Sequence, residues 1–291
     1  MHSRTQGIGH RLRALGAGIV MLGLAACQST PTPAAPAPTH EGTNAILWLQ
    51  TAAEYRAATL QAFRSATLHL ERALADPTWS AALEQQGEFG ALPPAIILDM
   101  DEAIIRSDRF QAGLVKNDGH YSLEVWNDWV RTETSEAISG ALEYAREARE
   151  RGIKIFYVTN RTAEVEASSL ATLRKLGFPV EGGLEDLLTQ HERPEWGSDK
   201  SSRRAVVCRT HRVIQIVGDN LNDFTSGAHS SLDRRLALTN RYADYWGSRW
   251  IVMPNPSYGG WDGALFEYDW SLSRGEILDR KREHLKTTED D

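Results

Sequence analysis

The sequence predicts an α/β protein built on a doubly wound parallel sheet. Four short apolar runs have the length and composition of strands that are buried on both faces: 95–98, 153–158, 213–217 and 250–253. Helical patterns lie between these runs, at 140–151, 163–176 and 201–209. Strands that alternate with helices along the chain are typical of a parallel sheet with helices on both faces.

The stretch before the first strand predicts an N-terminal helical segment over 45–92. Its apolar residues fall on one stripe over 45–75, which predicts a helix that ends at Asp76-Pro77. A second short helix is expected at 79–86. We expect most of these residues to serve packing.

The segment after the first strand does not have the pattern of a simple connection to the next strand. Residues 104–138 contain turn signals and aromatic residues. An insertion at this point would lie over the carboxyl end of the strand, so we expect a small, mostly helical cap here. The core with its cap is expected to span 93–270, with irregular structure at 181–199, and 271–291 is expected to be a charged tail with a solvent-exposed helix.

Composition favours one well-packed globular domain with a small accessory part. The chain has 291 residues, of which 41% are apolar, and it contains nine tryptophans. Its net charge is −7, from 32 basic and 39 acidic residues, and the basic residues are not clustered. This argues against a nucleic-acid polymer as the main partner.

Residues 1–26 have the pattern of a signal peptide. Basic residues precede an apolar stretch over 14–26 that is shorter than the ~20 residues a membrane-spanning helix needs. The stretch ends in Leu24-Ala25-Ala26-Cys27, which resembles a bacterial lipoprotein cleavage box and implies cleavage before Cys27 and lipid attachment to its sulfur. Ordinary secretion is the alternative. Because Cys27 is expected to carry lipid, Cys208 has no partner for an intramolecular disulfide.

The expected location is a lipid anchor on a bacterial membrane. Residues 27–44 are rich in Pro and Ala, which is typical of a semi-extended tether between an anchor and a folded part. Gln28 follows the cysteine where Asp could stand, and by analogy with enterobacterial sorting this favours the outer membrane.

Polar side chains gather at the ends of the predicted strands and at the start of one helix. They are Asp99, Asp101, Thr159, Lys200, Asp219 and Asp223. Because the carboxyl ends of parallel strands meet at one edge of the sheet, where ligands bind, we expect these side chains to lie close together. Carboxylates suit a hard cation such as Mg²⁺, and an ammonium group or a helix N-terminus suits a phosphate. The sequence therefore predicts a site for Mg²⁺ and a phosphoryl group.

The order of these motifs resembles that of the haloacid dehalogenase (HAD) superfamily of phosphatases: Asp-x-Asp after a strand, Thr after a later strand, then Lys, then Gly-Asp-Asn-x-x-Asp. Within that superfamily the chain is similar to the class C acid phosphatases, bacterial surface lipoproteins that hydrolyse 5′-nucleotides and related monoesters. The matching segments are 97–102, 126–130, 155–161, 200–204, 217–224 and 258–261. The resemblance implies a HAD-like core and a phosphate monoester as substrate.

The resemblance also implies roles for the acidic residues. Asp99 would attack phosphorus and form an aspartyl-phosphate. Asp101 would protonate the leaving oxygen and then deprotonate water, its acid form being favoured by the neighbouring carboxylate. Mg²⁺ would be held by Asp99, the backbone carbonyl of Asp101 and Asp219. Asp223 would be a further ligand, or would orient Lys200 and metal-bound water.

The remaining implied roles concern the substrate. Thr159, Asn160 and Lys200 would bind the phosphoryl oxygens. Trp126 and Tyr258 match the aromatic positions that sandwich the base or nicotinamide ring in this family, which implies nucleoside 5′-monophosphates or nicotinamide mononucleotide as substrates. For either aromatic ring, a packing role is the alternative.

Two departures and two alternatives accompany this interpretation. Ala103 stands where the family usually has a polar residue, and Phe110 stands where a Tyr is expected; both bear on substrate preference and neither removes a catalytic group. A non-catalytic surface lipoprotein that keeps the fold for binding or adhesion is one alternative. A noncovalent two-metal phosphatase is the other, and the scattered histidines argue against it. The oligomeric state is open, a dimer included.

Overall fold

The computed structural model describes residues 40–288, which contain a five-stranded sheet in which every neighbouring pair is parallel. Its strands, in spatial order, are β5 (Leu187–Gln190), β4 (Lys154–Thr162), β1 (Pro94–Leu98), β6 (Arg212–Gly218) and β7 (Trp250–Val252). The order reverses at β1, because the chain moves from β1 outward first to one side and then to the other. The predicted doubly wound α/β fold is confirmed.

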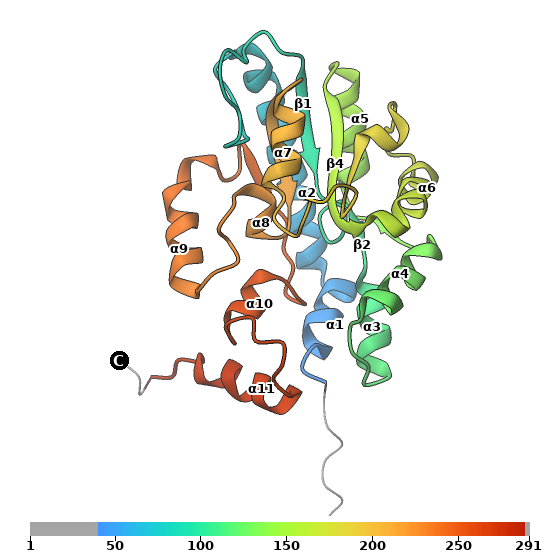
Figure 1. Ribbon diagram of the computed structural model, residues 1–291, viewed down its shortest axis with the longest axis vertical. Helices are drawn as coiled ribbons and strands as arrows, with labels where there is room; N and C mark the ends of the chain where they lie inside the picture. The colour runs from blue at the N-terminus through green and yellow to red at the C-terminus, as the bar shows by residue number, and fades with distance from the viewer. Residues whose placement is uncertain (1–39, 289–291) are drawn as a thin grey trace, which may run out of the picture. The chain divides into compact units, whose positions relative to one another are not determined.

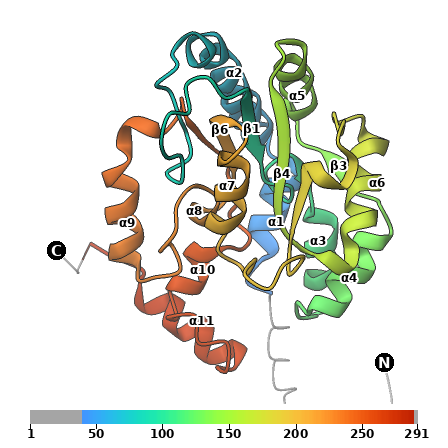
Figure 2. The same ribbon diagram turned by 45° about the horizontal axis from the view of Figure 1, so that its top comes forward.

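Helices cover both faces of the sheet. They include α5 (Ala141–Glu150), α6 (Glu166–Leu176), α7 (Ser201–Cys208) and α9 (Leu232–Arg241). In both views α2 and α5 lie on one side of the sheet and α7 on the other (Figure 1, Figure 2). Side chains alternate accordingly along β1: Ile96 and Leu98 pack in the core cluster on the α2–α5 side, and Ala95 and Ile97 in the cluster on the α7 side.

The predicted helix over 45–75 is two helices, α1 (Thr43–Thr51) and α2 (Ala53–Ala75), so the single-helix prediction is wrong at this point. Ala52 has φ −73° and ψ 125°, which is extended backbone. No Gly or Pro marks the break, because its cause is tertiary. α1 packs against α3 of the cap, whereas α2 packs against α5 and the sheet.

Three other segments differ from the secondary structure that the sequence predicts. The segment 79–86 is not a helix, because it runs along β6: the buried Trp79 indole donates to the Ile214 carbonyl at 2.8 Å, and Ala81 N donates to the Val213 carbonyl at 2.7 Å. The stretch 181–199 contains edge strand β5, which is too short to leave a clear apolar run. Helix α9 was not predicted, because Leu238 is its one buried residue and the apolar stripe is missing.

The insertion after β1 forms the expected cap. Its elements are β2 (Ile105–Arg106), α3 (Asp108–Lys116), α4 (Leu123–Arg131) and β3 (Glu136–Ala137). Strands β2 and β3 pair antiparallel and are the two connections between cap and core, so they form the hinge of the cap.

The chain after the last strand contains two short helices. They are α10 (Gly260–Ala264) and α11 (Arg274–Glu283). Helix α11 is mostly exposed, as expected, but it is tied down by Lys281, whose ammonium pairs with Glu41 at 3.1 Å and with Asp262 at 2.8 Å. Within residues 40–288 no helix is both long enough and apolar enough to cross a bilayer.

Candidate active site

The candidate site lies at the carboxyl edge of the sheet, where β1, β4 and β6 end side by side. Leu98 is in register with Tyr157 on one side and Val217 on the other. Asp99 N donates to the Val217 carbonyl at 2.9 Å, so the chain stays close to β6 one residue beyond the strand. This register brings the segments that carry Asp99, Thr159 and Asp219 together.

Lys200 lies between two carboxylates of this edge. Its Nζ is 2.5 Å from Asp99 Oδ1 and 2.6 Å from Asp223 Oδ1. Lys200 is 4% exposed and immediately precedes α7, which presents the ammonium group to the strand ends. Burial opposes the charged form, but the carboxylates of Asp223 and Asp99 outweigh it and raise the pKa of Lys200 above its ordinary value.

Asp99, Asp219 and Asp223 form a compact acidic cluster. One carboxylate oxygen from each lies within 4.8 Å of the others. Burial raises the pKa of Asp99 to about 7 against the opposing effect of Lys200, and burial and the neighbouring acids raise the pKa of Asp219. One ammonium group does not balance three carboxylates, so the cluster is arranged to accept a cation.

Local hydrogen bonds hold the acids after β6 in place. Asn255, from the loop after β7, donates Nδ2 to Asp219 Oδ2 at 2.8 Å. Asp223 Oδ2 accepts from Asn220 N at 2.8 Å and so caps helix α8 (Leu221–Phe224). A Cβ at Gly218 would lie 2.5 Å from the Cβ of Asp223, so only glycine lets this turn close. Sequence reasoning gave Asn255 no role, although its position at a strand end was a usable signal.

Asp101 is apart from the acidic cluster. Its two carboxylate oxygens accept from Arg161 Nε and Nη2, both at 2.8 Å. Arg161 is buried and also donates to Ser169 Oγ at 3.2 Å. This forked guanidinium contact fixes the position and orientation of the Asp101 carboxyl group. Arg161 was visible in the motif after Thr159 but was given no role.

Thr159 and Asn160 lie on β4 beside the acids. Thr159 is buried, and its Oγ1 accepts from Arg161 N at 3.1 Å. Both polar atoms of the Asn160 side chain form hydrogen bonds within the protein: Oδ1 accepts from Arg203 Nη2 at 2.6 Å, and Nδ2 donates to the Ser198 carbonyl at 3.1 Å. These bonds fasten the end of β4 to the segment before Lys200.

The two predicted stacking residues, Trp126 and Tyr258, lie in different surroundings. Trp126 is 7% exposed and packs in the cap, 5.0 Å from the ring centroids of both Phe110 and Trp129. The guanidinium carbon of Arg161 is 5.8 Å from its ring centroid. Tyr258 is partly buried. Trp126 and Tyr258 make no ring contact with each other in the structure of residues 40–288.

Glu102 joins three segments at the rim of the site. It is buried, it has φ 57°, and its carboxylate accepts from Ser107 N at 2.8 Å and from the hydroxyl of Tyr258. Burial is the largest cause that raises its pKa, to about 7. A non-glycine residue in the left-handed region indicates that the surroundings fix this backbone conformation.

The comparisons decide the family. The sequence matches the family described as HAD superfamily, subfamily IIIB (Acid phosphatase), over residues 22–261. The chain belongs to this family. It is an acid phosphatase of the HAD type, so the resemblance drawn from its motifs is confirmed.

Two solved structures of this acid phosphatase class are similar to the chain. They are the class C acid phosphatase from Bacillus anthracis and the same protein with tungstate bound. Each is 31% identical, with a TM-score of 0.75, and the match covers 84% of this chain and 97% of that one. Cys27, the predicted lipidation residue of this acid phosphatase, lies outside the described residues.

Proposed function

We propose that this acid phosphatase uses Mg²⁺ to hydrolyse nucleoside 5′-monophosphates or nicotinamide mononucleotide through an aspartyl-phosphate. The observation that carries the proposal is the contact of one buried ammonium, on Lys200, with two of three clustered carboxylates. This arrangement offers a nucleophile, a phosphate-binding cation and a metal site within one small volume.

The donor set suits Mg²⁺. The clustered atoms are carboxylate oxygens, which this hard cation prefers, and their negative charge exceeds the positive charge of Lys200. Asp99, Asp219 and the backbone carbonyl of Asp101 would hold the ion. Asp223 has both oxygens engaged, by Lys200 and by Asn220 N, which supports the role of orienting Lys200. When bound, Mg²⁺ would supply charge neutralisation for the phosphoryl oxygens.

The residues of the chain would share the two chemical steps. An Oδ atom of Asp99 attacks phosphorus while the bond from phosphorus to the ester oxygen breaks, and the Asp101 carboxyl gives its proton to that oxygen. In the second step the Asp101 carboxylate takes a proton from water, the water oxygen attacks phosphorus, and Asp99 is released. Lys200 and Thr159 would neutralise or bind the phosphoryl oxygens throughout.

The base or nicotinamide ring would contact Trp126 from the cap and Tyr258 from the loop after β7.

The location is also part of the proposal: a lipid on Cys27 would anchor the protein to the outer membrane, supported by the Leu24-Ala25-Ala26-Cys27 box. Tungstate, which the Bacillus anthracis relative binds, is an oxyanion, which supports oxyanion chemistry for the shared site. A dimer stays one option for the oligomeric state.

The test is phosphate release by the purified protein with Mg²⁺ and with EDTA. The substrates are 5′-AMP, nicotinamide mononucleotide, a 3′-nucleotide and p-nitrophenyl phosphate. We expect Mg²⁺-dependent release that favours the first two, and no release by Asp99→Asn. Equal rates on the 3′-nucleotide would contradict the substrate class, and unchanged turnover by Asp99→Asn would contradict the covalent step.

A further inference from the structure

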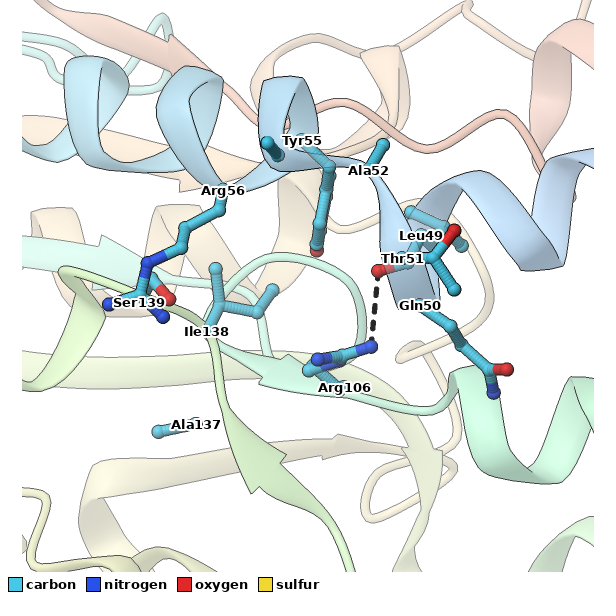
Figure 3. A pocket seen from close by; sticks show the side chains of 11 residues that line it. Leu49, Gln50, Thr51, Ala52, Tyr55, Arg56, Arg106, Ala137, Ile138 and Ser139 are labelled. Atoms are coloured by element: carbon cyan, nitrogen blue, oxygen red, sulfur yellow. Dashed lines mark hydrogen bonds between the residues drawn. The ribbon is translucent and has the colours of Figure 1, made fainter.

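A polar cavity of about 230 Å³ lies where α1 and α2 meet the hinge of the cap. Its walls are the break between the two helices on one side and β2 with the end of β3 on the other (Figure 3). Its polar side chains are those of Gln50, Thr51, Tyr55, Arg56, Arg106 and Ser139. None of the residues of the Asp99 site lines this cavity.

Tyr55 directs an unpartnered hydroxyl into the cavity. The residue is 7% exposed, and Figure 3 shows its oxygen pointing from α2 toward the strands. In the described part of the chain this hydroxyl makes no hydrogen bond. Burial is the main cause that raises the pKa of Tyr55, so the hydroxyl keeps its proton and is a donor. The hydroxyl oxygen itself is accessible from the cavity, so it can donate to a ligand or to solvent there.

Two guanidinium groups also line the cavity. Arg106 uses Nε and Nη2 for Asp108, at 2.6 and 2.9 Å, and Nη2 for the Leu49 carbonyl at 3.1 Å, and its Nη1 makes no hydrogen bond with residues 40–288. Arg56 pairs with no carboxylate in the same region and reaches down beside Ser139 (Figure 3). Asp108 balances Arg106 and Glu136 also acts on it, so the exposed Arg56 is the guanidinium of this lining that has no ion pair within residues 40–288.

The start of helix α2 also lies at the cavity. The helix has 23 residues, begins at Ala53 and has no side-chain cap. The first N–H groups of a helix have no acceptor within it, and its N-terminal end attracts negative charge. Ala52 and Ala53 line the cavity, so the first N–H groups of α2 are further donors at its wall, while Glu54 in the first turn and the adjoining end of α1 offset part of the positive potential.

We infer that this cavity binds a small oxyanion of the size and charge of inorganic phosphate. Tyr55, Arg56 and Arg106 would donate to it from two sides. Because Arg106 belongs to β2, and Ile138 and Ser139 follow β3, the anion would connect the N-terminal helices to both strands of the cap hinge. Inorganic phosphate is a product of a phosphatase, so the cavity would sense the product at a place separate from the Asp99 site.

The experiment is equilibrium dialysis of the purified full-length protein against radiolabelled inorganic phosphate. We expect Arg56→Gln to bind one phosphate fewer per chain than the wild type, and Tyr55→Phe to bind the second phosphate more weakly. The matched control is Arg64→Gln, an exposed arginine on the same helix outside the cavity, which should bind as the wild type does. Turnover of Arg56→Gln at saturating substrate should be unchanged, which also reports that the variant is folded.

Three results would overturn the inference. The first is equal phosphate stoichiometry for the wild type and Arg56→Gln. The second is an equal loss in Arg64→Gln, which would indicate diffuse charge in place of a site. The third is displacement of the second phosphate by chloride at the same ionic strength as effectively as by sulfate. A crystal soaked in tungstate gives a direct reading, because a peak between Tyr55 and Arg106 is expected in addition to one beside Asp99, and a peak beside Asp99 alone would overturn the inference.

Discussion

At the scale of single residues, the charge balance of the site depends on Lys200. Among residues 40–288, its ammonium is the one cationic group that bonds the carboxylates of Asp99, Asp219 and Asp223. When buried carboxylates lose such a partner, the free-energy cost of removing them from water is no longer compensated. Lys200 is therefore expected to matter both for folding and for binding the phosphoryl group.

Lys200→Met tests this double role. We expect phosphate release to fall at least about 100-fold, and the free energy of unfolding to fall by about 3–5 kcal/mol in metal-free buffer, because the acids lose their buried partner. Urea denaturation and initial rates measure the two effects. The control is Lys116→Met, an exposed lysine of the cap. A Lys200→Met protein with wild-type stability would show that the acids are protonated or solvated without the ammonium.

Arg161→Lys tests the positioning of Asp101. Lysine keeps the charge but loses the fork, so the Asp101 carboxyl should be misplaced and turnover of 5′-AMP should fall by about 100-fold. p-Nitrophenolate leaves without needing a proton, so the loss on p-nitrophenyl phosphate should be much smaller. The comparison of kcat on the two substrates is the measurement, with the exposed Arg174→Lys as control. Equal losses would show that Arg161 acts on a step other than proton transfer.

At the scale of the elements, the loop after β1 and the loop after β7 are joined by one residue. Glu102 accepts from Ser107 at the entrance to the cap and from the hydroxyl of Tyr258. Above its raised pKa of about 7 Glu102 is charged, and hydrogen bonds to a charged group contribute about 1.5–3 kcal/mol. Tyr258 therefore depends on Glu102 for its place at the rim.

Glu102→Gln keeps the shape of this side chain and removes its charge. If Tyr258 binds the ring of a nucleotide, the variant should raise the KM for 5′-AMP about tenfold and leave the KM for p-nitrophenyl phosphate within about twofold. Steady-state kinetics on both substrates is the measurement, and the exposed Glu88→Gln is the control. A rise of the same size for both substrates would assign Glu102 to the phosphate end of the site.

The elements also show what a sequence can and cannot predict. β1, β4 and β6 were predictable because their apolar runs are buried on both faces. The acids after β1 and β6, and Thr159 in β4, were predictable as site residues because they come directly after these runs. The break at Ala52 and the irregular segment after Trp79 were not predictable, because both are imposed by contacts with distant segments. Arg161 and Asn255 were missed likewise: each acts through a hydrogen bond to a carboxylate from another strand, and only the register of the sheet brings them together.

At the scale of the whole molecule, the site is assembled from segments spread over most of the described chain. Arg204, just after Lys200 on α7, is buried and binds Glu84 of the N-terminal segment at 2.7 Å and the Asp223 carbonyl at 2.9 Å. The loop that carries Asp219 and Asp223 is thus fastened to α7 and to the segment before β1. Occupation of the acidic cluster should therefore stabilise the fold as a whole.

Mg²⁺ is accordingly expected to raise the thermal stability of the protein. A ligand that binds the folded state alone stabilises it by about 2.7 kcal/mol at a concentration of 100 Kd, because unfolding must release it. The melting temperature should keep rising with the logarithm of the Mg²⁺ concentration above the Kd, because the stabilisation by a bound ligand has no plateau. Asp219→Asn should abolish the rise, since it removes a carboxylate that has Asn255 as its one hydrogen-bond partner within residues 40–288 and is otherwise free for the ion.

Asp262→Asn is the matched control, because Asp262 pairs with Lys281 away from the cluster and its loss should leave the Mg²⁺ response intact. A melting temperature that is independent of Mg²⁺ in the wild type would mean that the three acids hold no ion in the folded protein, and that protons neutralise Asp99 and Asp219, whose pKa values are raised.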